Sequence, residues 1–229
     1  MLEIQQNEEN MQEFLNVLSR CPLFDRVETE NIPGMLRCLD GRISTREKGE
    51  YVFSEGDRAD QVGILLKGKM QILREDLSGN RHVVASVDEG ELFGETFACA
   101  GADTLPVSIL CMEKCTVLLM DIRRITHSCS NACAFHQQVV MNLLRGLAEK
   151  TLMFHRKNHI LSRRTIRDKL LAYLSDESKR QGKRDFVIPF DRQSLADFLG
   201  VERSALSAEI GRMKKDGILD TERSRFRLL

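Results

Sequence analysis

The pattern of apolar and polar positions divides the chain into three parts. In the first forty residues, Met11, Phe14 and Leu18 fall at helical spacing, which predicts a short helix that ends near Cys21-Pro22. A second short helix is predicted over residues 29–39. We expect both helices to form a cover over the part that follows.

Short runs rich in Val, Ile, Leu and Thr make up the second part, from about residue 43 to residue 122, and glycines separate them. Glycine at such intervals supplies the positive backbone angles of tight turns, so this part predicts an antiparallel barrel or sandwich of about eight strands. We expect residues 112–114 to be the turn of a hairpin. The clearest predicted strands are 62–66, 69–73, 82–87, 107–111 and 115–120, with a hairpin connection over 76–80.

A heptad pattern begins beyond residue 130, where glycines nearly vanish. Positions in steps of four and three continue for about thirty residues, or about 45 Å at helical rise. Because a small barrel cannot cover a stripe of that length, we expect the helix to pair with its twin in a homodimer. The alternative is a long helix packed only on its own barrel. The predicted dimer interface comprises Val140, Leu144, Leu147, Thr151 and Phe154, in a pattern that also includes Cys133, Gln137, Asn158 and Leu161.

The last part has the spacing of a helix-turn-helix. Ala196 falls where two helices approach closely, Gly200 allows a left-handed turn, and Leu206 fills the core from the second helix. A strand predicted over 186–190 and a terminal hairpin over 218–229 complete a winged helix-turn-helix. The predicted α+β fold therefore has a sensor domain over 1–129, a dimerisation helix over 130–161 and a DNA-binding domain over 162–229.

Basic and small polar side chains follow the outward face of the second helix. An arginine at a helix start can bond O6 and N7 of guanine, so we predict Arg203 to be the main base reader. The other basic residues are predicted to bind phosphates. The alternative is a solvated face of an ordinary helical bundle. The predicted DNA-binding residues are Arg192, Gln193, Arg203, Ser204, Ser207, Arg212, Lys214, Lys215, Arg223 and Arg225, with Arg227 also on the wing.

The charge distribution changes the first impression that composition gives. The chain has 34 basic and 34 acidic side chains, which by itself argues against binding to nucleic acid. Residues 1–154, however, hold 16 basic and 23 acidic side chains, while residues 155–229 hold 18 and 11. A sensor of net charge −7 therefore precedes a tail of net charge +7, which favours a DNA-binding tail.

Composition and motifs also narrow the class of protein. Neither a membrane span nor a secretory signal is predicted, and seven scattered cysteines favour free thiols, so we place the protein in the cytoplasm with no membrane partner. An enzyme built on a barrel is the competing class. The sequence, however, shows no nucleophile turn, no phosphate-binding glycine-lysine loop and no HExxH zinc motif, so we predict no catalytic activity.

Four segments of the chain carry a family likeness. They are KGEYVFSEGD over 48–57, LLKGKMQI over 65–72, LFGE over 92–95 and LGVERSALS over 199–207. With these segments the whole chain resembles the Crp/Fnr family of bacterial transcription regulators. The resemblance implies a cyclic-nucleotide-binding-like barrel of the double-stranded β-helix or jelly-roll type. It also implies a homodimer that an effector switches, a palindromic DNA site with half-sites about one helical turn apart, and RNA polymerase as a further partner.

Two positions depart from the family pattern. In family members that bind cyclic nucleotides, Gly-Glu holds the ribose and an arginine about eleven residues past that glycine neutralises the phosphate. That position falls on Leu105, and no Lys or Arg occurs from 96 to 113, so cyclic AMP and cyclic GMP are disfavoured as effectors. In the recognition helix, Ser204 and Ala208 replace an acidic residue and a second arginine. The candidate effector pocket comprises Gly94, Glu95, Thr96, Phe97, Leu105, Pro106 and Thr151.

The effector itself has several candidates. Five of the seven cysteines fall within thirty-five residues and could sense oxidants or ligate a metal or heme, although core filling is the alternative. The sequence identifies no cofactor. Heme is one candidate, because a neutral pocket accepts an apolar ring, and a diatomic gas, a redox signal or another small molecule are the other candidate effectors. No metal site is predicted, although His155 and His159 share a helical face. The alternative function is a cyclic-nucleotide-binding module that regulates a protein partner. The five cysteines are Cys99, Cys111, Cys115, Cys129 and Cys133.

Overall fold

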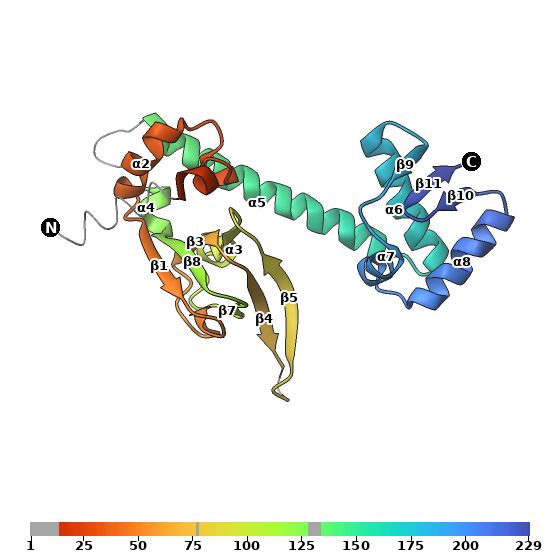
Figure 1. The fold of residues 1–229 in the computed structure, drawn as a ribbon, viewed down its shortest axis with the longest axis horizontal. Coiled ribbons are helices and arrows are strands. Elements are labelled where there is room, and N and C mark those ends of the chain that lie inside the picture. The colour runs from red at the N-terminus through yellow and green to blue at the C-terminus, as the bar shows by residue number, and fades with distance from the viewer. Residues whose placement is uncertain (1–13, 77, 128–133) are drawn as a thin grey trace. The chain divides into compact units, whose positions relative to one another are not determined.

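The computed structural model of the protein describes residues 14–76, 78–127 and 134–229 (Figure 1). The chain divides into two compact units, Met1–Ala148 and Glu149–Leu229. Three residues used in the sequence predictions, Met11, Cys129 and Cys133, lie outside the described residues.

Short helices at the start of the chain form the predicted cover. Residues 14–18 are helical, and Pro22–Phe24 (η1), Thr29–Asn31 (η2) and Ile32–Cys38 (α2) follow. Their apolar side chains are buried in one cluster with side chains of the sheet and of the long helix α5 (Ala134–Leu161). The members that show this junction are Leu18, Ile32 and Leu36 of the cover, Val62 and Ile64 of the sheet, and Val139 and Leu143 of α5.

The described residues between 42 and 121 form the eight predicted strands in two antiparallel sheets. The first sheet has the order β1 (Arg42–Arg46), β8 (Cys115–Asp121), β3 (Gln61–Lys67) and β6 (Leu92–Phe93). The second has the order β2 (Tyr51–Phe53), β7 (Ser108–Cys111), β4 (Met70–Glu75) and β5 (Arg81–Val87). Buried side chains of both sheets, among them Leu65, Met70, Val87, Ile109 and Val117, share one apolar cluster.

The predicted hairpin around residues 112–114 is wrong. Strand β7 pairs with β2 and β4, whereas β8 pairs with β1 and β3, so the chain passes from one sheet to the other at this turn. Cys111 and Cys115 flank the turn and both are buried. The sequence pattern of two apolar runs around a short polar turn is the same for a hairpin and for such a corner, so it could not separate them.

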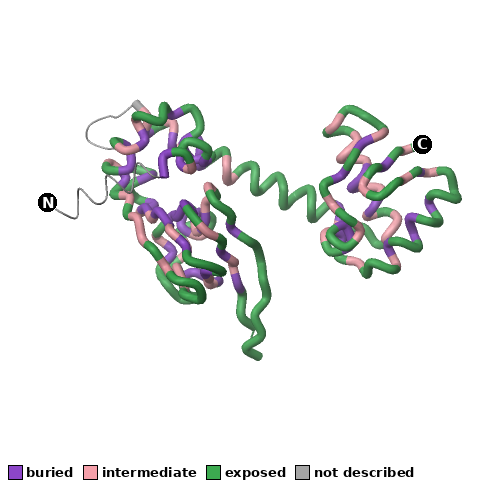
Figure 2. The backbone as a smooth tube through the Cα atoms, in the orientation of Figure 1, coloured by how far each residue is buried: buried purple, intermediate pink, exposed green. Residues whose placement is uncertain are grey.

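Helix α5 follows two short helices, α3 (Glu95–Ala100) and α4 (Ile122–Thr126). Asn142 donates hydrogen bonds to the carbonyl oxygens of Leu23 and Asp25 at 2.9 and 2.7 Å, which anchors the first half of α5 to the helical cover. Residues 148–159 are all exposed (Figure 2). Part of α5 therefore packs on its own unit, while the heptad positions Leu144 and Phe154 are 54% and 66% exposed.

The second unit is a small α+β domain with its own apolar cluster. Thr165 caps α6 by accepting a hydrogen bond from the Asp168 amide. Strand β9 ends two residues before Pro189, which lacks an amide donor. The elements are α6 (Ile166–Gln181), β9 (Asp185–Val187), α7 (Arg192–Leu199), α8 (Arg203–Lys215), β10 (Leu219–Glu222) and β11 (Arg225–Leu228), with sheet order β10-β11-β9.

None of the helices among the described residues is long and apolar enough to cross a membrane.

Candidate DNA-binding interface and effector site

The connection between α7 and α8 has the predicted helix-turn-helix geometry. Gly200 has a φ of 60° and ends α7, where its amide and that of Val201 bond carbonyl oxygens of the last turn. Ala196 and Leu206 are both fully buried, so the two helices approach closely at the alanine and the leucine fills the core below. The helix-turn-helix signature in the sequence is confirmed.

Helix α8 begins with an acidic cap that the sequence prediction missed. The carboxylate of Glu202 accepts hydrogen bonds from the amides of Ser204 and Ala205 at 3.0 and 2.8 Å. The Ser204 hydroxyl, together with these amides, holds the pKa of Glu202 below its usual range. The hydroxyl of Ser204 also donates to this carboxylate. Negative charge at a helix N-terminus is stabilising, so Glu202 fixes the start of α8 directly beside Arg203.

The outward face of α8 carries the predicted readers. Leu206, Ile210 and Met213 are buried, while Arg203, Ser207 and Lys215 are exposed. Among the described residues, neither Arg203 nor Lys215 has an ion-pair partner. Both are therefore available to an anionic ligand.

Other basic residues in the predicted set are already paired. Arg212 lies 3.2 Å from a carboxylate oxygen of Glu209, and Lys214 lies 2.6 Å from Asp220. The amide of Gln193 donates to Asp197 at 2.9 Å. A phosphate would have to compete with these partners.

Two arginines of the wing share one carboxylate. Arg225 and Arg227 each donate two hydrogen bonds to Asp185 of β9, with the shortest at 2.7 and 2.9 Å. These bonds lower the pKa of Asp185 to about 2. Arg223, at the turn of the wing, has a φ of 53° and, within the described part of the chain, no ion-pair partner.

Arg192 supports the wing from the start of α7. Its guanidinium lies 5.6 Å from the centroid of the Phe226 ring and donates to the carbonyl oxygen of Arg223 at 3.5 Å. The side chain is half-buried, and this burial lowers the pKa of Arg192. Sequence reasoning had assigned it only to phosphate binding.

We call residues 92–106, which contain Gly94 and the position Leu105, the cassette. Its backbone makes a left-handed turn at Gly94. Gly94 has a φ of 78°, and a Cβ there would lie 2.9 Å from the carbonyl oxygen of Gln61. Glu95 is buried and accepts a hydrogen bond from Thr96 at 3.4 Å. Leu105 is 3% exposed and belongs to the apolar cluster between the sheets.

Two further residues of the predicted pocket, Phe97 and Pro106, differ in exposure. Phe97 is half-buried against the apolar cluster, whereas Pro106 is exposed. Thr151 belongs to the second unit, so its part in the pocket stays a prediction.

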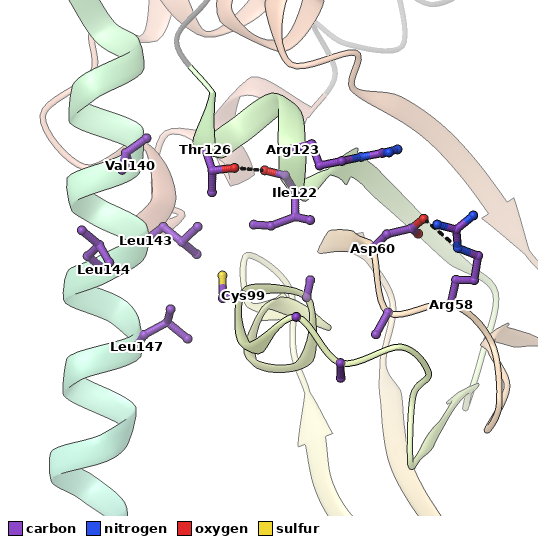
Figure 3. Close-up of a pocket in the computed structure, with 14 residues that line it drawn as sticks. Arg58, Asp60, Cys99, Ile122, Arg123, Thr126, Val140, Leu143, Leu144 and Leu147 are labelled. Atoms are coloured by element: carbon purple, nitrogen blue, oxygen red, sulfur yellow. Dashed lines mark hydrogen bonds and ion pairs between the residues drawn. The ribbon is translucent and has the colours of Figure 1, made fainter.

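A cleft of about 490 Å³ lies between α3, α4 and α5 (Figure 3). Leu143 and Leu147 of α5 point toward Cys99 of α3 across it. Val140, Leu144 and Leu147, three positions of the predicted dimer seam, are part of its lining. Sequence reasoning missed this cleft because segments far apart in the chain form it.

The described cysteines are mainly core residues. Burial raises the pKa of Cys21 to about 11, and burial together with the neighbouring Cys115 raises the pKa of Cys111 to about 12. Such thiols stay protonated and are poor nucleophiles. Cys99 is exposed, although partial burial and Glu95 raise the pKa of its thiol as well.

No cluster of three metal-ligating side chains occurs in the part of the chain that the structure describes. His159 lies 2.9 Å from a guanidinium nitrogen of Arg163, and both His155 and His159 are exposed.

Comparison with known proteins agrees with this architecture. Residues 44–131 match the model of the cyclic nucleotide-binding domain, and residues 168–229 match that of the Crp-like helix-turn-helix domain. The two matches define a transcription regulator with a DNA-binding helix-turn-helix. The chain belongs to the Crp/Fnr family of such regulators.

Similar curated proteins are regulators of transcription rather than enzymes. The chain is 26% identical over 180 residues to the nitrogen fixation regulation protein FixK of Rhizobium meliloti, covering 77% of each chain. It is 22% identical over 190 residues to the transcriptional activator FnrA of Stutzerimonas stutzeri, covering 80% of this chain and 75% of the relative.

Solved structures share the fold. The c-di-GMP responsive regulator CLP of Xanthomonas campestris has a TM-score of 0.52 at 19% identity, covering 88% of this chain and 99% of that one. CprK in complex with OCPA has a TM-score of 0.59 at 16% identity, covering 85% and 88%.

Proposed function

We propose that the protein is a homodimer that binds a palindromic DNA site and acts on transcription together with RNA polymerase. Each α8 would enter the major groove of one half-site, the half-sites being about one helical turn apart. The observation that carries this proposal is Arg203, an exposed arginine without an ion-pair partner among the described residues, at the first position of a helix that Glu202 caps. An arginine so placed can bond guanine O6 and N7 together.

The exposed apolar side chains of α5 support the dimer. Leu144, Leu152, Met153 and Phe154 are each more than half exposed, and apolar groups on a solvated helix favour association. Sedimentation should therefore give about twice the chain mass of 26.2 kDa. A stable monomer at micromolar concentration would contradict the dimer.

We also propose that the effector is not a cyclic nucleotide. The buried Leu105, in place of an arginine, supports this because a buried phosphate without a cation carries a large desolvation cost. The cleft beside α5 is lined by apolar side chains of α3, α4 and α5 together with Arg58, Asp60 and Arg123. Its volume is typical of sites for small ligands, which supports a mainly apolar effector such as heme. Cys99 lies in this lining and would hold the heme iron as its thiolate, and the iron would supply binding of a diatomic gas.

Selection of bound sequences from a pool of random duplexes tests this function. The full-length protein should recover an inverted repeat with guanine at one conserved position of each half-site. Recovery of unrelated sequences would contradict specific binding. Parallel selections with hemin, cyclic AMP or a hydroperoxide would show which compound changes the yield.

Spectroscopy tests the heme proposal separately. Titration of hemin with the protein should produce a sharpened Soret band, and the Cys99→Ser variant should shift it. A hemin spectrum that the protein leaves unchanged would remove heme as the effector.

A further inference from the structure

Helix α8 carries a buried acidic residue that faces away from the predicted DNA side. Glu209 is 7% exposed and stands among buried apolar residues of α8, Leu206, Ile210 and Met213. A buried carboxylate is strongly unfavourable unless it is paired and hydrogen-bonded. Here two arginines pair with it: Nε of Arg167 lies 2.7 Å from Oε1, and a terminal nitrogen of Arg212 lies 3.2 Å from Oε2.

Arg167 also bonds a second carboxylate on the same helix. Its terminal nitrogen lies 2.7 Å from Oδ2 of Asp216, the residue that ends α8. Negative charge at a helix C-terminus opposes the helix dipole, so Asp216 needs a cation there. These two bonds raise the pKa of Arg167. One planar guanidinium therefore joins two points of α8 that lie seven residues apart.

Two fixed points restrict α8 more than one does. Beside the buried apolar side chains of α8, a fork onto Glu209 and Asp216 restricts both the rotation of the helix and its position along its axis, more than a single ion pair would. Lysine cannot reproduce this, since its ammonium is a point charge without a planar fork.

The origin of Arg167 in the chain adds to its importance. It is the second residue of α6, two residues after the Thr165 cap and six residues after the end of α5. Arg167 therefore bonds α8, the predicted recognition helix, to the first turn of α6, which follows the segment that joins α5 to α6. A change at that segment would reach α8 through the Arg167 side chain.

We propose that Arg167 is a positioning residue for DNA recognition, one that sets the rotation and register of α8 so that Arg203 meets the base edge. This rests on the proposed function. Nε and one terminal nitrogen of Arg167 bond Glu209 and Asp216, so these donors are not available to DNA in this arrangement. Its loss should therefore lower the preference for the specific site more than the general affinity for DNA.

Binding of the full-length Arg167→Met and Arg167→Lys variants to the selected duplex and to a random duplex tests the proposal. By fluorescence anisotropy, Arg167→Met should bind the selected duplex about 10-fold more weakly, as expected when one bidentate base contact is lost, and the random duplex about equally. The slope of affinity against salt should not change, since no phosphate contact is removed. Arg167→Lys should restore only part of the preference.

Two controls separate positioning from stability. Arg180→Met removes an arginine near the other end of α6, where Arg180 pairs with Glu177 at 2.6 Å, and should leave the preference unchanged. The double variant Arg167→Met/Glu209→Met also removes the buried carboxylate, which Arg167→Met leaves with Arg212 as its one paired arginine. It should recover thermal stability, measured by calorimetry, without recovering the preference. Recovery of both would show a purely structural role and overturn the proposal.

The possible failures differ from one another. Wild-type protein that binds both duplexes equally would overturn the proposed function and this inference with it. Wild-type protein that discriminates, together with an Arg167→Met variant that discriminates equally well, would overturn the inference alone.

Discussion

The helix-turn-helix and the cassette around Gly94 are built alike but carry different chemistry. Each has a left-handed glycine next to a helix, with φ values of 60° at Gly200 and 78° at Gly94. The helix-turn-helix then presents the exposed Arg203, whereas the position that would neutralise a phosphate in the cassette is the buried Leu105. Backbone geometry can therefore persist where the charge needed for an anionic ligand is missing.

The largest effect should come from the helix-turn-helix cation. Arg203→Ala should weaken binding to the selected duplex by about 1 to 3 kcal/mol and relax discrimination at one base pair, because a bidentate guanine contact is lost. Lys215→Ala is the matched control. It should weaken binding to all duplexes similarly, since a phosphate contact carries no sequence information. Affinity measurements on selected and random duplexes check both.

Equal losses on the selected and random duplexes for Arg203→Ala and Lys215→Ala would show that Arg203 binds phosphate. As sites for an anion, the helix-turn-helix and the cassette would then differ only in that the helix-turn-helix carries a cation.

The two glycines should differ in their tolerance of alanine. Gly94→Ala should destabilise the first unit by about 2 kcal/mol, because a left-handed residue is strained and the new Cβ would lie 2.9 Å from a backbone oxygen of Gln61. Gly200→Ala should cost about 1 kcal/mol, since its nearest neighbour is the flexible Leu161 at 3.8 Å.

Denaturant unfolding of each variant measures these changes. Gly211→Ala is the control, because Gly211 lies inside α8 with open space around it, and it should stabilise the second unit by about 0.5 to 1 kcal/mol. A Gly94→Ala variant as stable as the wild type would show that the cassette backbone is not held as tightly as that of the turn.

A smaller effect is expected at the wing. Asp185→Asn should free Arg225 and Arg227, tighten binding to random duplex about 3-fold and steepen its dependence on salt. Asp121→Asn, which frees Arg123 in the first unit, is the control and should change neither quantity. An unchanged salt slope in the Asp185→Asn variant would show that the wing does not contact phosphate.

The titration of Asp185 should not affect binding near neutral pH. Its pKa is lowered to about 2, so the ion pairs contribute fully above the unfolded pKa of about 3.9 and are lost only as the pH falls toward 2. The affinity for DNA should therefore depend on pH between 6 and 8 in the same way in the wild type and in the Asp185→Asn variant.

Local patterns predicted much of this structure. The strand pattern, the turn at Gly200 and the buried face of Leu206, Ile210 and Met213 all depend on residues close together in sequence, and the structure confirms them. The exposed face of α8 follows from the same helical period. To predict these features, one does not need to know which other helix or strand each segment packs against.

Features that join distant segments could not be predicted. Arg225 and Arg227 share Asp185, which lies about forty residues earlier in the sequence. Arg167 and Arg212 share Glu209, which is buried and lies about forty residues after Arg167. Charge counts treat all these arginines as available to phosphate. The structure shows which are already neutralised by a protein carboxylate.

The smallest expected effect is that of a cyclic nucleotide on the wild-type protein. Family members with an arginine in the cassette bind the phosphate as an ion pair, but here the equivalent Leu105 packs in the cluster that contains Phe53 and Phe93. A ligand present at 100 times its dissociation constant would stabilise the first unit by about 2.7 kcal/mol. We expect no measurable shift in thermal unfolding at about 1 mM cyclic AMP or cyclic GMP, which corresponds to no binding tighter than millimolar. A clear stabilisation would show that backbone amides near Gly94 bind a phosphate without a cation, while Glu95 holds the ribose. The cassette would then be a functional anion site like the helix-turn-helix, and its geometry alone would be enough for binding.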